Sequence, residues 1–191
     1  MNTGNEYNTR SVMLMGLFVA LMIISSYVVL PIGPVPVTLQ TFVVLLAGIL
    51  LGSKLGPLSI IAWIILGCVG LPVFNQGQAG AVMLVGPTSG FIVSFVVMAW
   101  LVGYCTEKNA SNSVWFIAGA MILAVIVCYV LGLIGFKLSF AYFLHKPMSW
   151  TKGFILAVAP FLPFDIIKAV LASFIGIKVR SALLMAGLLN K

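Results

Sequence analysis

Long apolar runs with few polar interruptions are the feature that most constrains the fold of this chain. Each run has about the length that an α-helix needs to cross a bilayer, and only 7% of the 191 residues are charged. Within the runs, apolar residues follow one another without the alternation expected of strands in a membrane barrel. The sequence therefore predicts an all-α integral membrane protein that lies in the lipid bilayer and forms a single domain over residues 1–191.

Prolines, glycines and polar residues divide the apolar sequence into six predicted transmembrane helices. We detect no internal repeat, because the two halves of the chain differ in helix length and in the placement of proline and glycine. The inverted repeat that is common among secondary transporters is therefore not indicated. The expected spans are residues 11–30, a short span that follows residues 37–41 and ends near 52, and then 57–73, 88–106, 114–136 and 160–177.

Basic residues in the connections between the spans predict the orientation of the chain. Six spans place both termini on one side, and because lysine and arginine are enriched in cytoplasmic loops, their distribution favours cytoplasmic termini. The basic residues form no patch or stripe, so the net charge of +7 does not indicate nucleic acid as a partner. Arg10, Lys54, Lys108, Lys178, Arg180 and Lys191 fall on the side of the termini, and Lys137, Lys146 and Lys152 on the other.

Two charged side chains interrupt the last apolar run. Asp165 and Lys168 are the only charges between Phe154 and Ile177, and their spacing places them on one face of a helix that we expect after a break at 160–163. A charged side chain within the bilayer costs about 3 kcal/mol on insertion scales, so it is usually paired, turned inward and functional. The alternative is a salt bridge that only fixes this helix, although a buried pair contributes little net stability.

Three irregular segments converge with this charged pair on the side opposite the termini: residues 31–36, residues 74–87 and the beginning of the last span. Irregular backbone at membrane depth is tolerated where it lines a cavity, so we predict a small binding pocket that opens outward. Asp165 would accept hydrogen bonds from N–H donors, and Lys168 would donate to a carboxylate or carbonyl. Neutral contacts are expected from Thr38, Gln40, Asn75, Gln76, Thr88 and Ser89, and apolar cover from Phe74, Phe91, Phe161 and Phe164.

No arrangement of residues in the sequence indicates catalysis or a metal centre. The single histidine, His145, falls in a predicted loop, and the three cysteines lack the close spacing of metal or redox motifs. The sequence contains no G-x-S-x-G, no H-E-x-x-H and no nucleotide-binding loop. We therefore expect a chain that is not an enzyme and needs no cofactor, and an intramembrane hydrolase is disfavoured.

Four short motifs follow one another over nearly the whole chain. They are PVPVTLQT from Pro34, GLPVF from Gly70, GPTSGF from Gly86 and PFDIIKA from Pro163. Together they resemble the BioY family, the biotin-specific substrate-binding (S) components of energy-coupling-factor (ECF) transporters. The chain departs from the family pattern where Ser89 replaces a glycine and Phe91 replaces a tyrosine.

The resemblance implies a six-helix protein of the plasma membrane that captures biotin with high affinity on the extracellular side. It also implies a transmembrane coupling subunit and two cytoplasmic ATPases as partners. By the resemblance, Asp165 and Lys168 would bind biotin, with residues 38–41 as a lid or wall. Gly16 and Ala20 stand where the family carries an A-x-x-x-A coupling motif, so we expect partner docking there; packing within the helix bundle is the alternative.

The residues also leave a second class of function open. A proton-coupled secondary transporter of a small carboxylate-bearing solute would use Asp165 as its proton carrier and would work without partner subunits. The missing repeat and the single acid within the predicted spans argue against it. Uptake by this chain alone, abolished by an uncoupler, distinguishes this function from ATP-driven uptake.

Overall fold

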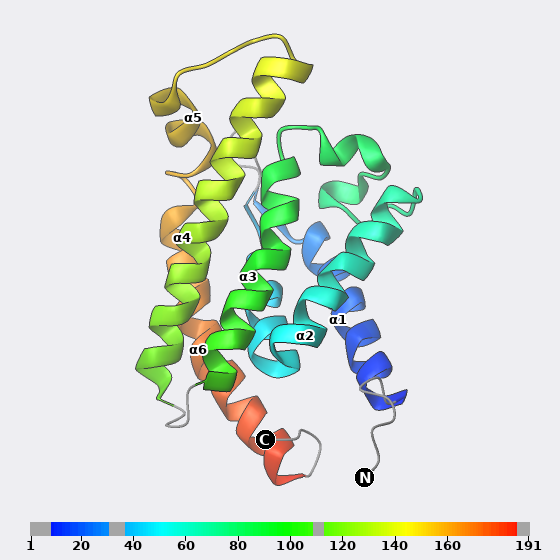
Figure 1. Cartoon of the computed structure of the whole chain (residues 1–191), viewed down its shortest axis with the longest axis vertical. Helices are drawn as coiled ribbons and strands as arrows, with labels where there is room; N and C mark the ends of the chain where they lie inside the picture. The colour runs from blue at the N-terminus through cyan, green and yellow to red at the C-terminus, as the bar shows by residue number, and fades with distance from the viewer. Residues whose placement is uncertain (1–8, 31–36, 109–112, 187–191) are drawn as a thin grey trace.

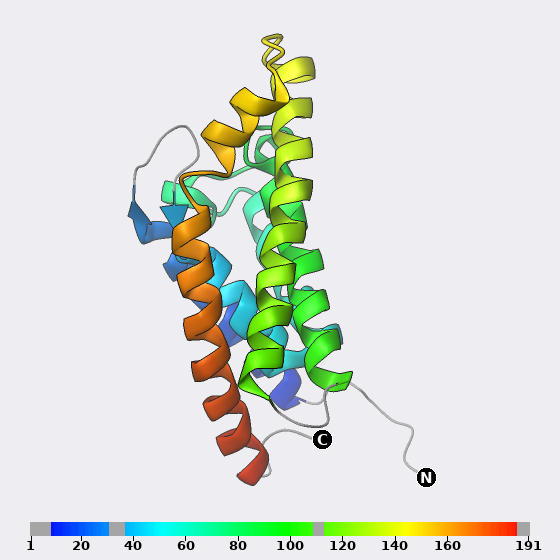
Figure 2. The same cartoon turned by 90° about the vertical axis from the view of Figure 1, so that its left-hand side faces the viewer.

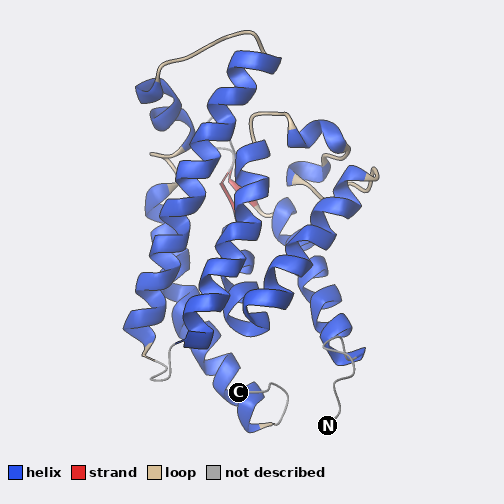
Figure 3. Ribbon diagram, in the orientation of Figure 1, coloured by secondary structure: helices blue, strands red, loops and turns tan. Residues whose placement is uncertain are grey.

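The computed structural model describes residues 9–30, 37–108 and 113–186. The chain is almost entirely helical in these ranges, with one short pair of strands (Figure 3). The predicted proline-rich loop at 31–36 and Lys191 lie outside the described residues. The elements are α1 (Thr9–Tyr27), β1 (Val29–Leu30), β2 (Val37–Thr38), α2 (Gln40–Cys68), η1 (Asn75–Gly77), η2 (Ala81–Leu84), α3 (Ser89–Lys108), α4 (Val114–Leu138), η3 (Ser139–Phe143), α5 (Trp150–Ala157) and α6 (Leu162–Met185).

Four described helical segments are long and apolar enough to cross a membrane: α1, α2, α3, and α4 continued through η3. Helices α5 and α6 form a fifth candidate, a pair bent by 52° at the break after Ala157. This bend confirms the predicted interruption near Pro160, and Asp165 lies in the first turn of α6 as expected. Six separate helices are not confirmed, because the predicted second span and most of the predicted third span (57–73) belong to the single element α2, which ends at Cys68.

Helix α2 is interrupted by a sharp kink at Gly52, which has φ +80° and ψ −174°. These angles favour glycine, since a side chain at positive φ is strained. The carboxylate of Glu107 accepts hydrogen bonds from the backbone N–H of Ser53 (2.7 Å) and from its hydroxyl (2.6 Å), at the beginning of the second arm. The guanidinium of Arg180 donates to the carbonyl oxygen of Ile49 (3.0 Å), at the end of the first arm.

These two contacts explain how the chain tolerates a break inside α2. The first residues of a helix leave N–H groups unpaired and carry partial positive charge, and the last residues leave carbonyls unpaired and carry partial negative charge. Glu107 from α3 supplies the acceptor and Arg180 from α6 supplies the donor, each with the charge that its helix end favours. Arg180 was expected only to favour the orientation of the chain in the membrane, so its role at the end of the first arm was not predicted.

Helix α3 packs between α2 and α4 (Figures 1 and 2). Small residues allow this close approach: a Cβ atom placed on Gly90 would lie 2.8 Å from the Cα atom of Gly135 in α4. On the α2 side, Gly103 lies directly against the backbone at Gly52. Close contact of backbones through small residues is typical of helix packing in membranes.

The outer surface of the bundle is apolar. Large side chains such as Met13 of α1 (63% exposed) and Trp115 of α4 (77% exposed) point away from the core. An exposed apolar surface of this extent fits a protein surrounded by lipid. Aromatic rings with a lysine nearby, Lys108 over Tyr104 and Lys137 over Trp150, flank the bundle as expected for side chains at the two membrane interfaces.

Helix α1 begins and α6 ends at the same end of the molecule, while the connection from α4 to α5 lies at the other end (Figures 1 and 2). This arrangement agrees with the prediction that both termini lie on one side. The strand pair and the first turn of α6 lie in the half away from the beginning of α1. The predicted binding residues therefore gather on the side opposite the termini.

We expect Glu107→Ala to lower the free energy of unfolding by about 1–2 kcal/mol, because it removes the acceptor at the beginning of the second arm of α2. The measurement is reversible unfolding in detergent micelles or bicelles. Lys108→Ala, at the adjacent position, is the matched control and should change stability much less. Equal losses in the two variants would contradict the capping role of Glu107.

Candidate ligand-binding site

A cavity lies between β2, the beginning of α2, the beginning of α3, the middle of α4 and the beginning of α6. It contains about 680 Å³ of space between protein atoms, part of which is open to solvent. Its mostly apolar lining with a few polar groups is typical of small-molecule pockets. The lining residues are Val37, Thr38, Gln40, Thr41, Trp63, Phe74, Asn75, Met83, Thr88, Phe91, Ile92, Phe95, Cys128, Tyr129, Ala157, Phe161 and Asp165.

Aromatic side chains hold the apolar wall in place. Trp63, only 1% exposed, donates its indole N–H to the carbonyl oxygen of Val73 (3.0 Å). Its ring meets Phe74 edge to face, with 5.1 Å between the centroids, and it also lies near Phe95. A buried tryptophan is stable when its N–H finds a partner, and this one fixes the segment that follows α2 against the cavity.

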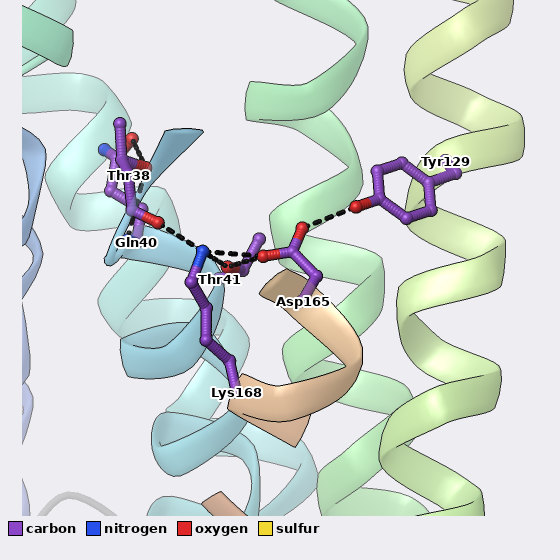
Figure 4. Close-up of polar contacts among 6 residues, drawn as sticks. All are labelled: Thr38, Gln40, Thr41, Tyr129, Asp165 and Lys168. Carbon is purple, nitrogen blue, oxygen red and sulfur yellow. Dashed lines mark hydrogen bonds and ion pairs between the residues drawn. The ribbon is translucent and has the colours of Figure 1, made fainter. Parts of the chain in front are cut away.

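The buried carboxylate of Asp165 is the centre of the polar side of the cavity (Figure 4). Its Oδ1 accepts hydrogen bonds from the Thr41 hydroxyl (2.8 Å) and from the ammonium group of Lys168 (2.7 Å). Its Oδ2 accepts one from the Tyr129 hydroxyl (2.6 Å). A carboxylate oxygen accepts about two hydrogen bonds, so one acceptor position of Oδ2 is not used by the described residues.

Lys168 lies beside the polar side of the cavity, in contact with Asp165 as predicted. Its ammonium group donates to the backbone carbonyl of Thr38 (2.7 Å), to Asp165 and to the Thr41 hydroxyl (3.3 Å). It is not among the residues that line the cavity. The predicted ion pair between Asp165 and Lys168 is present, and Asp165 is the member of the pair that lines the cavity.

Three polar atoms of the lining are buried and have no hydrogen-bond partner among the described residues. They are Nε2 of Gln40, Oδ1 of Asn75 and Oγ1 of Thr88. A buried polar group left unpaired destabilises a protein by about 1–3 kcal/mol, and native structures contain few of them. Their convergence on one cavity fits a ligand that accepts from Gln40, donates to Asn75 and pairs with the Thr88 hydroxyl.

The structure brings most of the predicted site residues together. Gln76 and Ser89 lie outside the lining: Gln76 is exposed in η1, and Ser89 is the buried first residue of α3, whose N–H donates to Gly86. Phe164 is also absent from the lining and is 38% exposed. The predicted residues in the lining are Thr38, Gln40, Asn75, Thr88 and Asp165, with the aromatic residues Phe74, Phe91 and Phe161.

Sequence reasoning missed Tyr129, which donates to Asp165 from the middle of α4. A signal was present, because Tyr129 is the only hydroxyl-bearing residue between Val114 and Leu138. A polar group in such an apolar span needs a partner inside the protein. Thr41 was assigned only to a lid or wall, whereas its side chain binds the carboxylate directly.

Gly16 and Ala20 lie on the exposed face of α1, away from the cavity. A Cβ atom placed on Gly16 would meet nothing within 4 Å among the described residues. The alternative that Gly16 serves close packing within the bundle is therefore not supported. The pair contributes small exposed residues to the outer surface of α1, which also carries larger exposed residues such as Leu17 and Ile24.

Comparison with known proteins identifies the family. The model of the BioY family matches residues 1–185. The chain belongs to the BioY family. It is 36% identical over 171 residues to the biotin transporter BioY of Thermotoga maritima, covering 90% of this chain and 96% of that protein. It is 38% identical, with the same coverage, to a probable biotin transporter BioY of Pyrococcus horikoshii.

A solved structure supports the same assignment. The crystal structure of the S component for biotin from an ECF-type ABC transporter matches with a TM-score of 0.82 and 29% identity, over 94% of this chain and 95% of that one. The resemblance to the BioY family drawn from the four motifs is thus confirmed. These relatives are transporters and a transporter component, which confirms the expectation that this BioY protein is not an enzyme.

We expect Tyr129→Phe to lower the stability of the ligand-free protein by about 1.5–3 kcal/mol, because a hydrogen bond to a buried charge is lost. The measurement is unfolding in detergent without ligand. Tyr142→Phe removes a hydroxyl from a side chain that is 71% exposed and serves as the matched control. A Tyr129→Phe protein as stable as Tyr142→Phe would contradict the role of Tyr129 in holding Asp165.

Proposed function

We propose that this BioY protein binds biotin in the cavity as the substrate-specificity subunit of an ATP-driven uptake transporter. The observation that carries the proposal is the set of unpaired polar atoms around an apolar cavity next to a buried carboxylate. Biotin is a largely apolar molecule with two N–H groups and a carbonyl on its ureido ring and a carboxylate at the end of its side chain. The apolar wall and the few polar groups match this distribution.

The hydrogen-bonding groups of the site complement those of the ligand. The free acceptor position on Asp165 Oδ2 and the unpaired Asn75 Oδ1 would each accept one ureido N–H. The unpaired Gln40 Nε2 and the Thr88 hydroxyl would donate to oxygen atoms of the ligand. Each contact would relieve a buried unpaired group, so it favours the bound state.

Electrostatics favour one orientation of the ligand. Asp165 is paired with Lys168, so the site is close to neutral before biotin enters. A ligand carboxylate beside Asp165 would be repelled in a poorly screened environment. We therefore place the ureido ring at Asp165 and the carboxylate toward the neutral donors.

The arrangement in the membrane follows from the fold and the distribution of charge. Counting the two arms of α2 separately, and α5 with α6 as one broken span, gives six spans with both ends of the chain on one side. The excess of lysine and arginine favours that side as the cytoplasmic one. The cavity would then open to the outside of the plasma membrane and capture biotin there.

We also propose the partners. The solved relative is a component of an ECF-type transporter, and no nucleotide-binding loop occurs in this sequence. A transmembrane coupling subunit and two cytoplasmic ATPases would therefore supply the energy. The exposed small residues Gly16 and Ala20 would let a helix of the coupling subunit approach α1 closely. The alternative proton-coupled secondary transporter is not favoured by these relatives.

Equilibrium binding of biotin to the purified protein tests the function. We expect a dissociation constant below 1 µM, and we expect Asp165→Asn to weaken binding by about 10- to 150-fold, as for loss of a hydrogen bond to a charged group. Glu107→Gln makes the same change at the other described acid, far from the cavity, and should leave affinity unchanged. Failure of the parent protein to bind biotin below micromolar concentration would contradict the proposal.

Uptake by cells that express the whole transporter tests the docking surface. We expect Gly16→Leu with Ala20→Leu to abolish uptake and leave biotin binding intact, because bulky side chains would block close helix approach. Gly119→Leu changes an equally open glycine on α4 and should leave both intact. If binding falls in parallel with uptake in the α1 variant, the pair has a structural role instead.

A further inference from the structure

We propose that Tyr27, the last residue of α1, is a positioning residue that holds the segment 72–78 at the cavity and so slows release of the ligand. Tyr27 is not among the residues that line the cavity, whereas Phe74 and Asn75 of this segment are. This role deepens the proposed function and rests on it, because it concerns the release of the ligand. Tyr27 contacts the segment in two ways, by a hydrogen bond and by its ring.

The segment 72–78 is closed by hydrogen bonds of its own backbone. The N–H of Phe74 donates to the carbonyl oxygen of Gln78 (3.0 Å), and the N–H of Gly77 donates to the carbonyl oxygen of Phe74 (3.0 Å). Such bonds give the segment its shape, but they do not fix its place relative to the helices. Contacts with other elements must therefore hold Asn75 at the cavity.

Two neighbouring carbonyl groups attach the segment to two helices. The Tyr27 hydroxyl donates to the carbonyl oxygen of Pro72 (2.6 Å), and the indole N–H of Trp63 in α2 donates to that of Val73 (3.0 Å). Tyr27 thus connects the segment to α1, and Trp63 connects it to α2. Without the Tyr27 hydroxyl, the hydrogen bond to α1 at Pro72 is lost and the one to α2 remains.

The ring of Tyr27 also lies against the segment on the other side of Asn75. A Cβ atom placed on Gly77 would lie 3.3 Å from the Tyr27 hydroxyl oxygen and 3.5 Å from Cε1. Gly77 has φ +76°, which favours glycine. Asn75 therefore lies between Phe74, whose buried ring packs on Trp63, and Gly77, which packs on Tyr27.

The place of Asn75 matters for the ligand because its Oδ1 is buried without a partner among the described residues. Under the proposed function this oxygen accepts a ureido N–H, and movement of the segment away from the cavity would break that contact. Segments with few attachments open locally at a lower free energy than the whole protein unfolds. Tyr27 is 53% exposed, so loss of its hydroxyl would leave no cavity in the core and would act through this attachment alone.

The first arm of the experiment measures the rate of biotin dissociation from the parent, Tyr27→Phe and the control Tyr104→Phe. The control loses the same hydroxyl from a tyrosine that is 45% exposed, in α3 at the end away from the cavity. We expect dissociation about 2- to 10-fold faster in Tyr27→Phe, as for loss of one hydrogen bond, and the parent rate in the control. An unchanged rate in Tyr27→Phe would overturn the proposal.

The same comparison in an Asn75→Ala background tests whether Tyr27 acts through Asn75. Two changes that act through one contact are not additive. We therefore expect Tyr27→Phe to add little to the dissociation rate of Asn75→Ala. If it accelerates dissociation by the same factor in both backgrounds, Tyr27 does not position Asn75 and the proposal is wrong.

The second arm needs no ligand and measures amide hydrogen exchange in the three proteins with Asn75 intact. The N–H of Gly80 donates to the carbonyl oxygen of Gly67 (2.8 Å), a bond that joins the chain after the segment to the end of α2. We expect exchange at residues 73–80 to be about 2- to 10-fold faster in Tyr27→Phe only, with exchange in the middle of α4 unchanged. Unchanged exchange at 73–80, or equal acceleration in α4, would overturn the proposal. If the parent does not bind biotin, the proposed function fails, but this arm still decides whether Tyr27 holds the segment.

Discussion

The buried carboxylate of Asp165 is the constraint on which the rest of this structure depends. A carboxylate with 4% exposure is stable only if hydrogen bonds and a counter-ion replace the water that it has lost. The replacements come from three elements: Thr41 from α2, Tyr129 from α4 and Lys168 from α6 itself. The hydrogen bonds of this one carboxylate therefore connect α2, α4 and α6. The cavity lies at the point where these three helices meet.

A second set of charges serves the opposite end of the bundle. Glu107 and Arg180 satisfy the two helix ends created by the break at Gly52, so α3 and α6 both hold α2 there. Helix α6 thus contacts the first arm of α2 twice, through Lys168, which donates to the Thr41 hydroxyl near the cavity, and through Arg180 near the kink. These two contacts fix the position of the first arm of α2 along α6. They therefore also fix the positions of Gln40 and Thr41.

Much of the fold could be predicted, because it follows from strong local signals. The apolar runs predicted membrane helices, and Pro160 predicted the break before α6, since proline disrupts a helix where it removes a backbone donor. The second and third spans were harder to predict, because their boundary is a kink at Gly52 that distant residues stabilise. Glu107 lies 54 positions after its partner Ser53, and Arg180 lies 131 positions after its partner Ile49. No local pattern reveals such a distant contact.

The candidate site was predicted only in part, because some of its residues have a local signal in the sequence and others depend on distant contacts. Asp165 stood out because a charge in an apolar run is rare. Thr88 belonged to the GPTSGF motif, and Asn75 to the irregular segment 74–87. Whether a side chain faces the cavity depends on details of local backbone, so Gln76 and Ser89 were included although they lie outside the lining. Tyr129 was omitted because its importance arises from Asp165, 36 residues away.

The proposed function depends on one hydrogen bond above all. In it, Oδ2 of Asp165 accepts from an N–H group of the ligand at the acceptor position that the described residues do not use. A structure of the protein with biotin bound tests this most directly. The account predicts a ureido nitrogen within hydrogen-bonding distance of Oδ2, with the contacts of Thr41, Tyr129 and Lys168 to Asp165 retained. Biotin bound elsewhere, or bound in the cavity with Asp165 touching only its present three partners, would contradict it.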